Sequence, residues 1–169
     1  MDNKLPERKK IRLGSYDYSK PGIYFITVCV KNRMPILWNM KNAVPGMHAE
    51  DVPLSDIGHT VKKGILQIPD IYSNIKIKKF CIMPDHIHVL IQIEPYDSDL
   101  PSKHPTIPTV IGSFKRWVSK ETGMSMWQKS FIDRVVRDDD EYRNVWKYID
   151  NNPTFFEEED DGLLDFENM

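Results

Sequence analysis

The chain has 169 residues, of which 40% are hydrophobic and 28% are charged, so it has the size and composition of one globular domain with a buried core. No apolar run approaches the roughly 18–20 residues that cross a bilayer, so no membrane association is expected. The only two cysteines, Cys29 and Cys81, have no metal-type spacing and give no disulfide framework, and a cytoplasmic location is therefore expected.

The charged residues are unevenly distributed along the chain. The formal net charge is −2, yet residues 157–167 hold seven acidic residues and no Lys or Arg, which leaves 18 acidic against 23 basic residues elsewhere. The sequence therefore divides into a moderately basic body, residues 1–156, and an acidic C-terminal tail, residues 157–169. A basic body is compatible with binding nucleic acid, but a solvated surface explains the same charge equally well.

The first half of the chain predicts a basic arm over residues 1–20, then a strand, a loop and a helix. Residues 23–30 are rich in β-branched and aromatic side chains, which indicates a strand buried on both faces. Residues 38–54 contain several turn-forming residues and predict a loop. Ser55 is a plausible N-cap for a helix that Pro69 would end. The apolar face of this helix is formed by Ile57, Val61, Ile65 and Leu66.

Two antiparallel strands and a linker follow. Residues 75–83 and 86–93 predict the strands, with a tight turn over Met83-Pro84-Asp85 between them. Residues 94–108 hold four prolines among polar residues, which is typical of a linker.

The last third predicts a helix, a short edge strand and a final helix. Hydrophobic spacing from Val110 onward indicates a helix with Gly123 as its C-cap, and residues 127–136 predict the edge strand. Asp138 and Glu141 form a capping-box pattern for a helix that runs to about Asn152, where Pro153 stops it. This order of elements predicts an α+β fold in which helices cover an antiparallel sheet.

The first candidate site is the pair His86 and His88. Residues i and i+2 of a strand share a face, so the two imidazoles should project side by side, roughly parallel, away from the apolar packing of Ile87 and Val89. Paired neutral imidazoles are natural ligands for a divalent metal. Two hydrogen-bonded, half-buried histidines would explain the same spacing, and by itself the short pattern favours that reading.

The second candidate site lies on the last helix. Tyr142, Val145, Trp146 and Ile149 form its apolar stripe, and Tyr148 and Asn152 lie one turn apart at the edge of that stripe. One interpretation is that Tyr148 is a nucleophile and that Asn152 is a third metal ligand through its amide oxygen. The alternative is a boundary tyrosine with its hydroxyl in water and an asparagine that caps the helix.

The two sites together suggest phosphoryl transfer. A tyrosine has a pKa near 10, so it needs help to attack at neutral pH. A metal bound to a phosphate oxygen would withdraw charge, and Tyr148 could then form a covalent phosphotyrosine that keeps the energy of the broken bond.

Four motifs in order resemble one protein family. Met83-Pro-Asp-His-Ile-His-Val-Leu90 resembles the histidine–hydrophobic–histidine signature of the IS200-like single-tyrosine (Y1) transposases, which are HUH endonucleases. Tyr148-Ile-Asp-Asn-Asn-Pro153 resembles the tyrosine motif of their REP-associated branch. Residues 127–137 resemble the segment before that helix, and residues 24–33 resemble the first strand and its exit, so the likeness covers roughly residues 12–156.

The resemblance implies a single Y1 transposase-like catalytic domain over residues 1–156, with the ferredoxin-like sheet of HUH endonucleases. It implies that His86 and His88 bind Mg²⁺ or Mn²⁺ and that Tyr148 becomes linked to a DNA 5′ end, leaving a free 3′-hydroxyl. Asn152 matches the place where related insertion-sequence transposases carry a metal-binding Gln. The implied substrates are single strands with hairpins, and a homodimer is one of the states that the family adopts.

Two groups of basic residues are candidates for DNA binding. The N-terminal arm carries Arg8, Lys9, Lys10 and Arg12, which could hold phosphates or a hairpin stem. The helix after residue 110 carries Lys115, Arg116 and Lys120 beside Trp117, which could follow phosphates and stack a base. A solvated basic face with one core aromatic explains the second group equally well.

Two other functions compete with a transposase. A nucleic-acid-binding module of the same fold that has lost catalysis would bind DNA without Tyr148, and a metal-dependent hydrolase that acts through bound water would turn over without it. The first conflicts with the presence of both histidines and the tyrosine. The second lacks an obvious carboxylate base.

Overall fold

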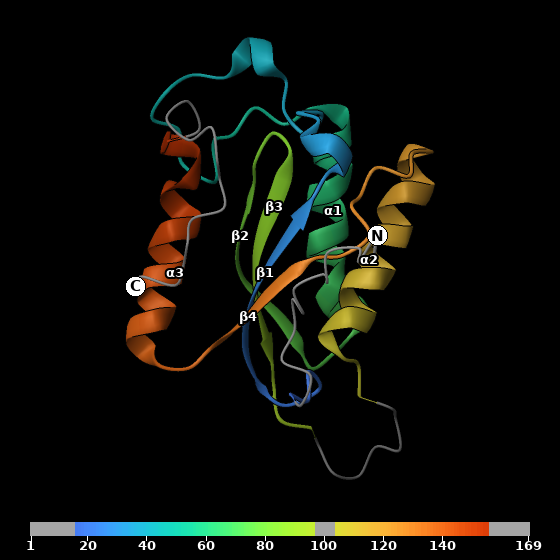
Figure 1. Cartoon of the computed structure of the whole chain (residues 1–169), viewed down its shortest axis with the longest axis vertical. Helices are drawn as coiled ribbons and strands as arrows, with labels where there is room; N and C mark the ends of the chain where they lie inside the picture. Colours follow the sequence, from blue (N-terminus) through green and yellow to red (C-terminus); the bar gives the residue numbers. More distant parts are fainter. Residues whose placement is uncertain (1–15, 97–103, 156–169) are drawn as a thin grey trace, which may run out of the picture.

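Strand-forming residues build a sheet with helices on both of its faces (Figure 1). The computed structural model describes residues 16–96 and 104–155. Its strands are β1 (Gly22–Cys29), β2 (Ile75–Ile82), β3 (His86–Ile93) and β4 (Ile132–Val136), and its helices are α1 (Asp56–Ile71), α2 (Ile107–Thr122) and α3 (Asp139–Asn151). The sheet has the order β2-β3-β1-β4, and its pairings are antiparallel. The expected α+β, ferredoxin-like architecture is confirmed.

The register of the central strands brings three polar side chains together. Strand β1 pairs with β3 so that Thr27 lies opposite His88 and Cys29 lies opposite His86. Alternation along each strand then points these residues, with Phe25, toward the face that α3 covers. Strand β4 lies at the edge next to β1, as expected, but it begins only at Ile132.

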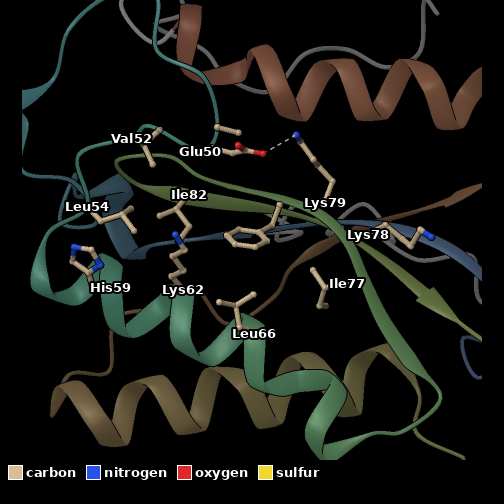
Figure 2. A pocket seen from close by; sticks show the side chains of 12 residues that line it. Glu50, Val52, Leu54, His59, Lys62, Leu66, Ile77, Lys78, Lys79 and Ile82 are labelled. Atoms are coloured by element: carbon tan, nitrogen blue, oxygen red, sulfur yellow. Dashed lines mark ion pairs between the residues drawn. The ribbon is translucent and has the colours of Figure 1, made fainter.

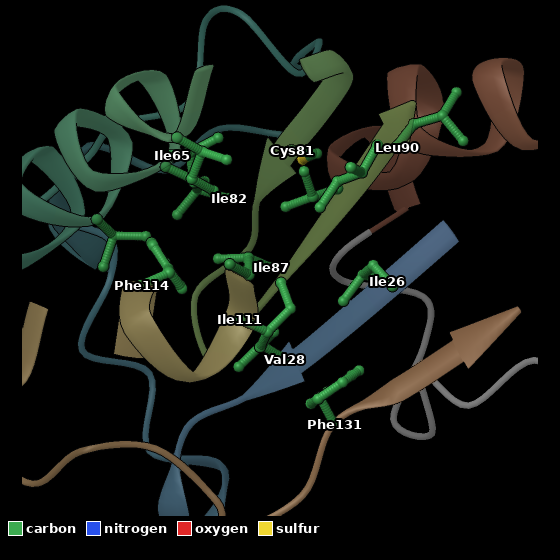
Figure 3. Packing of buried hydrophobic residues seen from close by; sticks show 14 of the residues in the cluster. Ile26, Val28, Ile65, Cys81, Ile82, Ile87, Leu90, Ile111, Phe114 and Phe131 are labelled. Carbon is green, nitrogen blue, oxygen red and sulfur yellow. The ribbon is translucent and has the colours of Figure 1, made fainter. Parts of the chain in front are cut away.

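The hydrophobic core is divided between the two faces of the sheet. Figure 3 shows Ile65 of α1 and Phe114 of α2 against Val28, Ile82 and Ile87 of the sheet. On the other face, α3 presents Val145 and Ile149. Six of the eight residues of β1 are buried, which confirms the prediction of a strand covered on both faces.

The predicted helix caps are present. Ser55 accepts a hydrogen bond from the Gly58 amide, Asp138 accepts one from the Glu141 amide, and Gly123 adopts the left-handed conformation with φ of 67°. The helix α2 begins earlier than predicted, because Thr106 caps it and Pro108 fits its first turn, where no amide hydrogen is needed.

The predicted end of α1 at Pro69 is wrong. The helix continues to Ile71, and the amide of Tyr72 donates to the carbonyl of Ile68. Proline has a helical φ and removes only one hydrogen bond in this last turn, while burial of Ile68 holds the turn on the sheet. Leu66 also differs from its predicted place on the buried face, because 53% of its surface is exposed.

Candidate active site

The two histidines converge at the start of β3. The Nε2 atoms of His86 and His88 lie 3.1 Å apart, so the prediction that the side chains project side by side is confirmed. The rings are not parallel, however, since their planes meet at 78° with centroids 4.7 Å apart. The strand sets only the direction of each Cβ, whereas contacts at the far side of each ring set its rotation.

The orientation of each imidazole ring is held by a hydrogen bond at its Nδ1 atom. The Nδ1–H of His86 donates to a carboxylate oxygen of Asp85 at 2.6 Å, and the Nδ1 of His88 lies 2.9 Å from the hydroxyl oxygen of Thr27. When the Nδ1–H of His88 donates to the Thr27 hydroxyl, the Nε2 atoms of both histidines carry lone pairs that point to the same place. When the Thr27 hydroxyl instead donates to Nδ1, the proton of His88 is on Nε2 and can be donated to the Nε2 of His86. The pair can therefore be satisfied alone or can offer two ligands to one cation.

Arg33 completes this support from the segment that follows β1. Its Nε donates to the second carboxylate oxygen of Asp85 at 2.7 Å, and its Nη1 lies 3.3 Å from the Cys29 sulfur. Both Asn32 and Arg33 have positive φ, at 54° and 51°, so the chain turns sharply where β1 ends. Asparagine tolerates this conformation, but for arginine it is costly and has to be held by its contacts.

Burial and charge keep His88 neutral. Burial, followed by the nearby charges of His86 and Arg33, lowers the pKa of His88 well below its usual value. Burial alone would raise the pKa of Asp85. The hydrogen bonds from His86 and Arg33 outweigh burial and hold the pKa of Asp85 below its usual value. At neutral pH the site therefore contains an ionised carboxylate behind His86 and an uncharged imidazole at His88.

Tyr148 of α3 contacts the histidine pair through His88. Its hydroxyl oxygen lies 3.5 Å from the Nε2 of His88, and the two ring centroids are 5.2 Å apart. Phe25 stacks on His88 at 5.3 Å and meets Tyr148 edge-on at 6.0 Å, so one aromatic side chain fixes both. Tyr148 thus contacts the histidine site within a single chain, unlike a boundary tyrosine that faces only water.

Asn152 supplies a buried oxygen near the tyrosine. Its side chain is 7% exposed, and its Oδ1 has no hydrogen-bond partner among the described residues. It lies four residues after Tyr148, which is about 6 Å along a helix axis. Residues 16–96 and 104–155 contain no group of three or more His, Cys, Asp or Glu that could hold a metal. A third protein ligand would therefore be of another type, and an orphaned amide oxygen is suitable.

The chain matches the family described as transposase, IS200-like, over residues 23–152. It belongs to the IS200-like transposase family. Members of this family are transposases, which cut and rejoin DNA, so the family that the sequence resembles is confirmed.

Similar proteins agree with the family assignment. A Haemophilus influenzae protein named only as uncharacterized is 30% identical over 174 residues, covering 92% of this transposase and 93% of its own chain. A second protein of that organism, named as a candidate REP-associated tyrosine transposase, is 25% identical over 148 residues, with 81% and 73% coverage. A solved REP-associated tyrosine transposase bound to a REP hairpin has a TM-score of 0.60 at 20% identity, covering 84% of this chain and 72% of its own, and it shows the shared fold.

The predicted DNA-binding residues of α2 in this transposase lie away from the tyrosine. The helix α2 packs on the sheet face opposite α3 (Figure 1). The ammonium group of Lys115 donates to the carbonyls of Gln128, Lys129 and Ser130, which fixes that loop to α2. Arg116 and Lys120 are exposed. Their role in DNA binding stays a prediction, and Arg8, Lys9, Lys10 and Arg12 lie outside the described residues.

For three residues of the site, Phe25, Thr27 and Arg33, the sequence predicted no role. They lie in the segment that resembles the family's first strand and its exit, but they reach the histidines only through the pairing of β1 with β3 and the turn after β1. A signal for Thr27 was present, since it is the single aliphatic hydroxyl residue within the apolar run of residues 23–30. No local pattern reports which residue of a distant strand lies opposite His88.

Proposed function

We propose that this transposase cuts single-stranded DNA beside a hairpin, using Tyr148 as the nucleophile, and rejoins the strand by reversing that step. The observation that carries the proposal is the convergence of three groups, with the Nε2 of His88 3.1 Å from that of His86 and 3.5 Å from the Tyr148 hydroxyl. A hairpin is the proposed substrate because the similar solved transposase is bound to one.

The proposed reaction has two steps, cleavage and rejoining. The Tyr148 oxygen attacks a backbone phosphorus, a new bond forms between them, and the bond from phosphorus to the 3′ oxygen breaks. The departing oxygen takes up a proton and becomes a free 3′-hydroxyl, while the 5′ phosphate stays on the tyrosine. Attack by a 3′-hydroxyl on this linkage restores a DNA phosphodiester and releases Tyr148.

The donor set of the site fits a divalent ion. The Nε2 atoms of His86 and His88 lie 3.1 Å apart, close enough for both to bind one ion, and imidazole nitrogens are common ligands of divalent metals. His86, His88 and the orphaned oxygen of Asn152 would hold the ion. Mg²⁺ or Mn²⁺ there would polarise the phosphate and stabilise its developing charge.

The protein's own groups prepare this chemistry. Asp85 and Thr27 orient the two imidazoles, and the lowered pKa of His88 keeps its imidazole uncharged at neutral pH, so that one ring nitrogen has a free lone pair. Phe25 holds the tyrosine ring over the pair. The hydroxyl must move away from His88 before a phosphate group can enter, so a shift of Tyr148 or of α3 precedes the reaction.

End-labelled DNA tests the proposal. A single strand with a hairpin and Mn²⁺ should give a denaturation-resistant protein adduct that retains a 3′-end label, while a 5′-end label appears on a free fragment. The variants Tyr148→Phe and His86→Ala should form no adduct. DNA binding without any adduct from the wild-type protein would identify a non-catalytic binding module. Cleavage that survives Tyr148→Phe would identify a water-dependent hydrolase.

A further inference from the structure

Lys79 of the edge strand β2 is a largely buried lysine that the proposed reaction does not use. Its side chain is 13% exposed, and a lysine is seldom so enclosed unless it is paired. Its ammonium lies 2.7 Å from the Asp150 carboxylate and 5.1 Å from the ring centroid of Trp146, both on α3. We propose that Lys79 is a positioning residue that sets the rotation of α3 and, through it, the place of the Tyr148 hydroxyl, which rests on the function proposed above.

A bulge in β2 directs Lys79 toward α3. The pairing of β2 with β3 shifts between Ile77 and Lys79, so Lys78 is the extra residue of the bulge. Beyond the shift Lys79 lies opposite Leu90, on the sheet face that α3 covers. Without the bulge Lys78 would occupy that position, and Lys79 would point to the other face. Bulges are frequent beside active sites, where they redirect a side chain.

The contacts of this lysine oppose rotation of α3 about its own axis. The buried residues of α3 are Val145 and Ile149, which form a narrow stripe against the sheet. At about 100° per residue, Trp146 and Asp150 lie together on one side of this stripe, and Tyr148 lies on the other. A helix held by so narrow a stripe can roll, and a roll moves both sides at once. A fixed contact at Asp150 therefore fixes the position of Tyr148.

Asp150 is held through its main chain as well. The amide of Ala49 donates to the Asp150 carbonyl at 3.3 Å. Glu50, the next residue, lies 4.0 Å from the Lys79 ammonium, and Figure 2 shows the lysine reaching from β2 toward it. The main-chain bond does not depend on the Asp150 side chain, so it persists when the carboxylate is replaced. Loss of the carboxylate should therefore release the rotation of α3 without detaching its end.

Fluorine NMR of metal-free, full-length protein that contains 3-fluorotyrosine tests the position of Tyr148 without any reaction. Tyr148→Phe identifies its signal, which depends on the His88 ring at 5.2 Å and the Phe25 ring at 6.0 Å. Asp150→Asn, which keeps the shape of the side chain but removes its charge, should shift or broaden this signal. Asp150→Glu, which keeps the charge, should leave it near the wild-type position.

The rate of adduct formation tests the effect on the reaction. With saturating hairpin DNA and Mn²⁺, Asp150→Asn should form the Tyr148 adduct about tenfold more slowly, because a displaced nucleophile is less often in line with the phosphate. The DNA concentration that gives half the maximal rate should not change, and Asp150→Glu should react like the wild type. Lys79→Met should slow the reaction to the same extent, and the double variant should be no slower, since both changes remove one ion pair.

Glu94→Gln is the matched control. Glu94 pairs with Lys76 of the same strand at 2.6 Å, so this change also removes one carboxylate and one ion pair of β2, but it leaves the contacts of Lys79 with α3 in place. It should leave the fluorine signal of Tyr148 and the rate of adduct formation unchanged. Equal effects of Glu94→Gln and Asp150→Asn would assign both to a general loss of charge and would overturn the inference.

The inference is also overturned if Asp150→Asn has the wild-type fluorine signal or the wild-type rate, or if its lost rate is fully recovered at higher DNA concentration. Failure of the proposed function is a different result, because the wild-type protein then forms no adduct with the hairpin DNA. The fluorine signal still decides in that case whether the pair of Lys79 and Asp150 positions Tyr148.

Discussion

Two side chains behind His86 decide how that ring is presented. Asp85 accepts from its Nδ1, and Arg33 holds the carboxylate from the other side at 2.7 Å. A carboxylate in this position fixes the tautomer, so the lone pair of His86 is on Nε2, and it makes that nitrogen a stronger ligand. Asp85 is therefore expected to act on metal affinity through His86.

Replacing Asp85 tests this role directly. Asp85→Ala should weaken Mn²⁺ binding by about 10- to 100-fold, because His86 loses its orientation and basicity. Isothermal titration with Mn²⁺ gives the affinity without requiring turnover. Asp51→Ala removes an exposed carboxylate from the loop before α1 and should leave the affinity unchanged. Equal affinities for wild type and Asp85→Ala would show that Asp85 does not act on metal binding through His86.

The buried state of His88 gives a pH dependence of stability. Its pKa is lowered in the folded protein, whereas the unfolded chain has the ordinary value near 6.5. Between these two pKa values the unfolded state binds a proton that the folded state does not. The free energy of unfolding should therefore fall as the pH drops below about 6.5, with a slope of up to about 1.4 kcal/mol per pH unit from this residue.

Urea unfolding of chelator-treated protein between pH 7.5 and 5 measures this slope. His88→Gln should flatten it, and His48→Gln, which changes an exposed histidine, should not. The neighbouring His86, Arg33 and Tyr148 remain in both variants, so a difference between them belongs to His88. A wild-type slope that survives in His88→Gln would contradict the assignment.

At the scale of single residues the sequence predicted candidate site residues but not the side chains that hold them. The H-x-H spacing and the Y-x-x-x-N spacing are local, so they are sufficient to name His86, His88, Tyr148 and Asn152 as candidates. Thr27 and Arg33 act across a strand pairing and a left-handed turn, and both depend on long-range register. The roughly parallel rings that were expected prove edge-on, because their outer hydrogen bonds set the rotation.

Helix α3 is the element on which the proposed chemistry depends. It is tied at its start by the cap Asp138, and at its end by the bond from the Ala49 amide and the ion pair from Lys79. Glu141 also accepts from the Arg137 amide and pairs with Arg134, so the first turn is held to β4. These ties position Tyr148 over the histidines.

Removal of the cap should loosen this helix measurably. Asp138→Ala leaves the Glu141 amide without its partner, which costs about 1 kcal/mol and lowers Tm by about 2–4 °C for a chain of this size. Asp139→Ala, one residue later in the same acidic turn, should change Tm far less. Thermal unfolding by circular dichroism compares them. Equal Tm values would show that the cap carries no stability.

Helices and strands were predicted well where interactions between residues close in the sequence determine their ends. The bounds of β3 and the caps Ser55, Gly123 and Asp138 agree with the structure, because alternation and capping act over a few residues. The end of α1 was wrong, since burial of its last turn outweighs the proline. Leu66 fits the helical spacing of apolar residues in α1 but lines an open pocket beside the edge strand β2. Helical spacing alone does not show where the neighbouring sheet ends.

The whole molecule combines a basic body with an acidic tail. The family and the fold are established, and one chain brings the Tyr148 hydroxyl within 3.5 Å of His88. Among residues 16–96 and 104–155, no helix is long and apolar enough to cross a membrane. The tail, the basic arm and a dimeric state stay predictions.

Charge alone predicts an effect of the tail on DNA association. A chain ending at residue 156 loses seven acidic residues and becomes net basic, so it should associate with DNA faster at low salt. The gain should shrink as salt is added, since screening reduces long-range attraction. Stopped-flow association at two ionic strengths measures this. Identical rates for both chains at low salt would show that the tail does not act on DNA through its charge.

The central claim is that Tyr148 becomes covalently joined to DNA. After reaction with hairpin DNA and Mn²⁺, nuclease and trypsin digestion should release the peptide that follows Lys147, residues 148–169, which contains a single tyrosine. Mass spectrometry should find a nucleotide phosphate on Tyr148 of this peptide. An unmodified peptide together with a modification elsewhere, for example on Tyr142, would contradict the account.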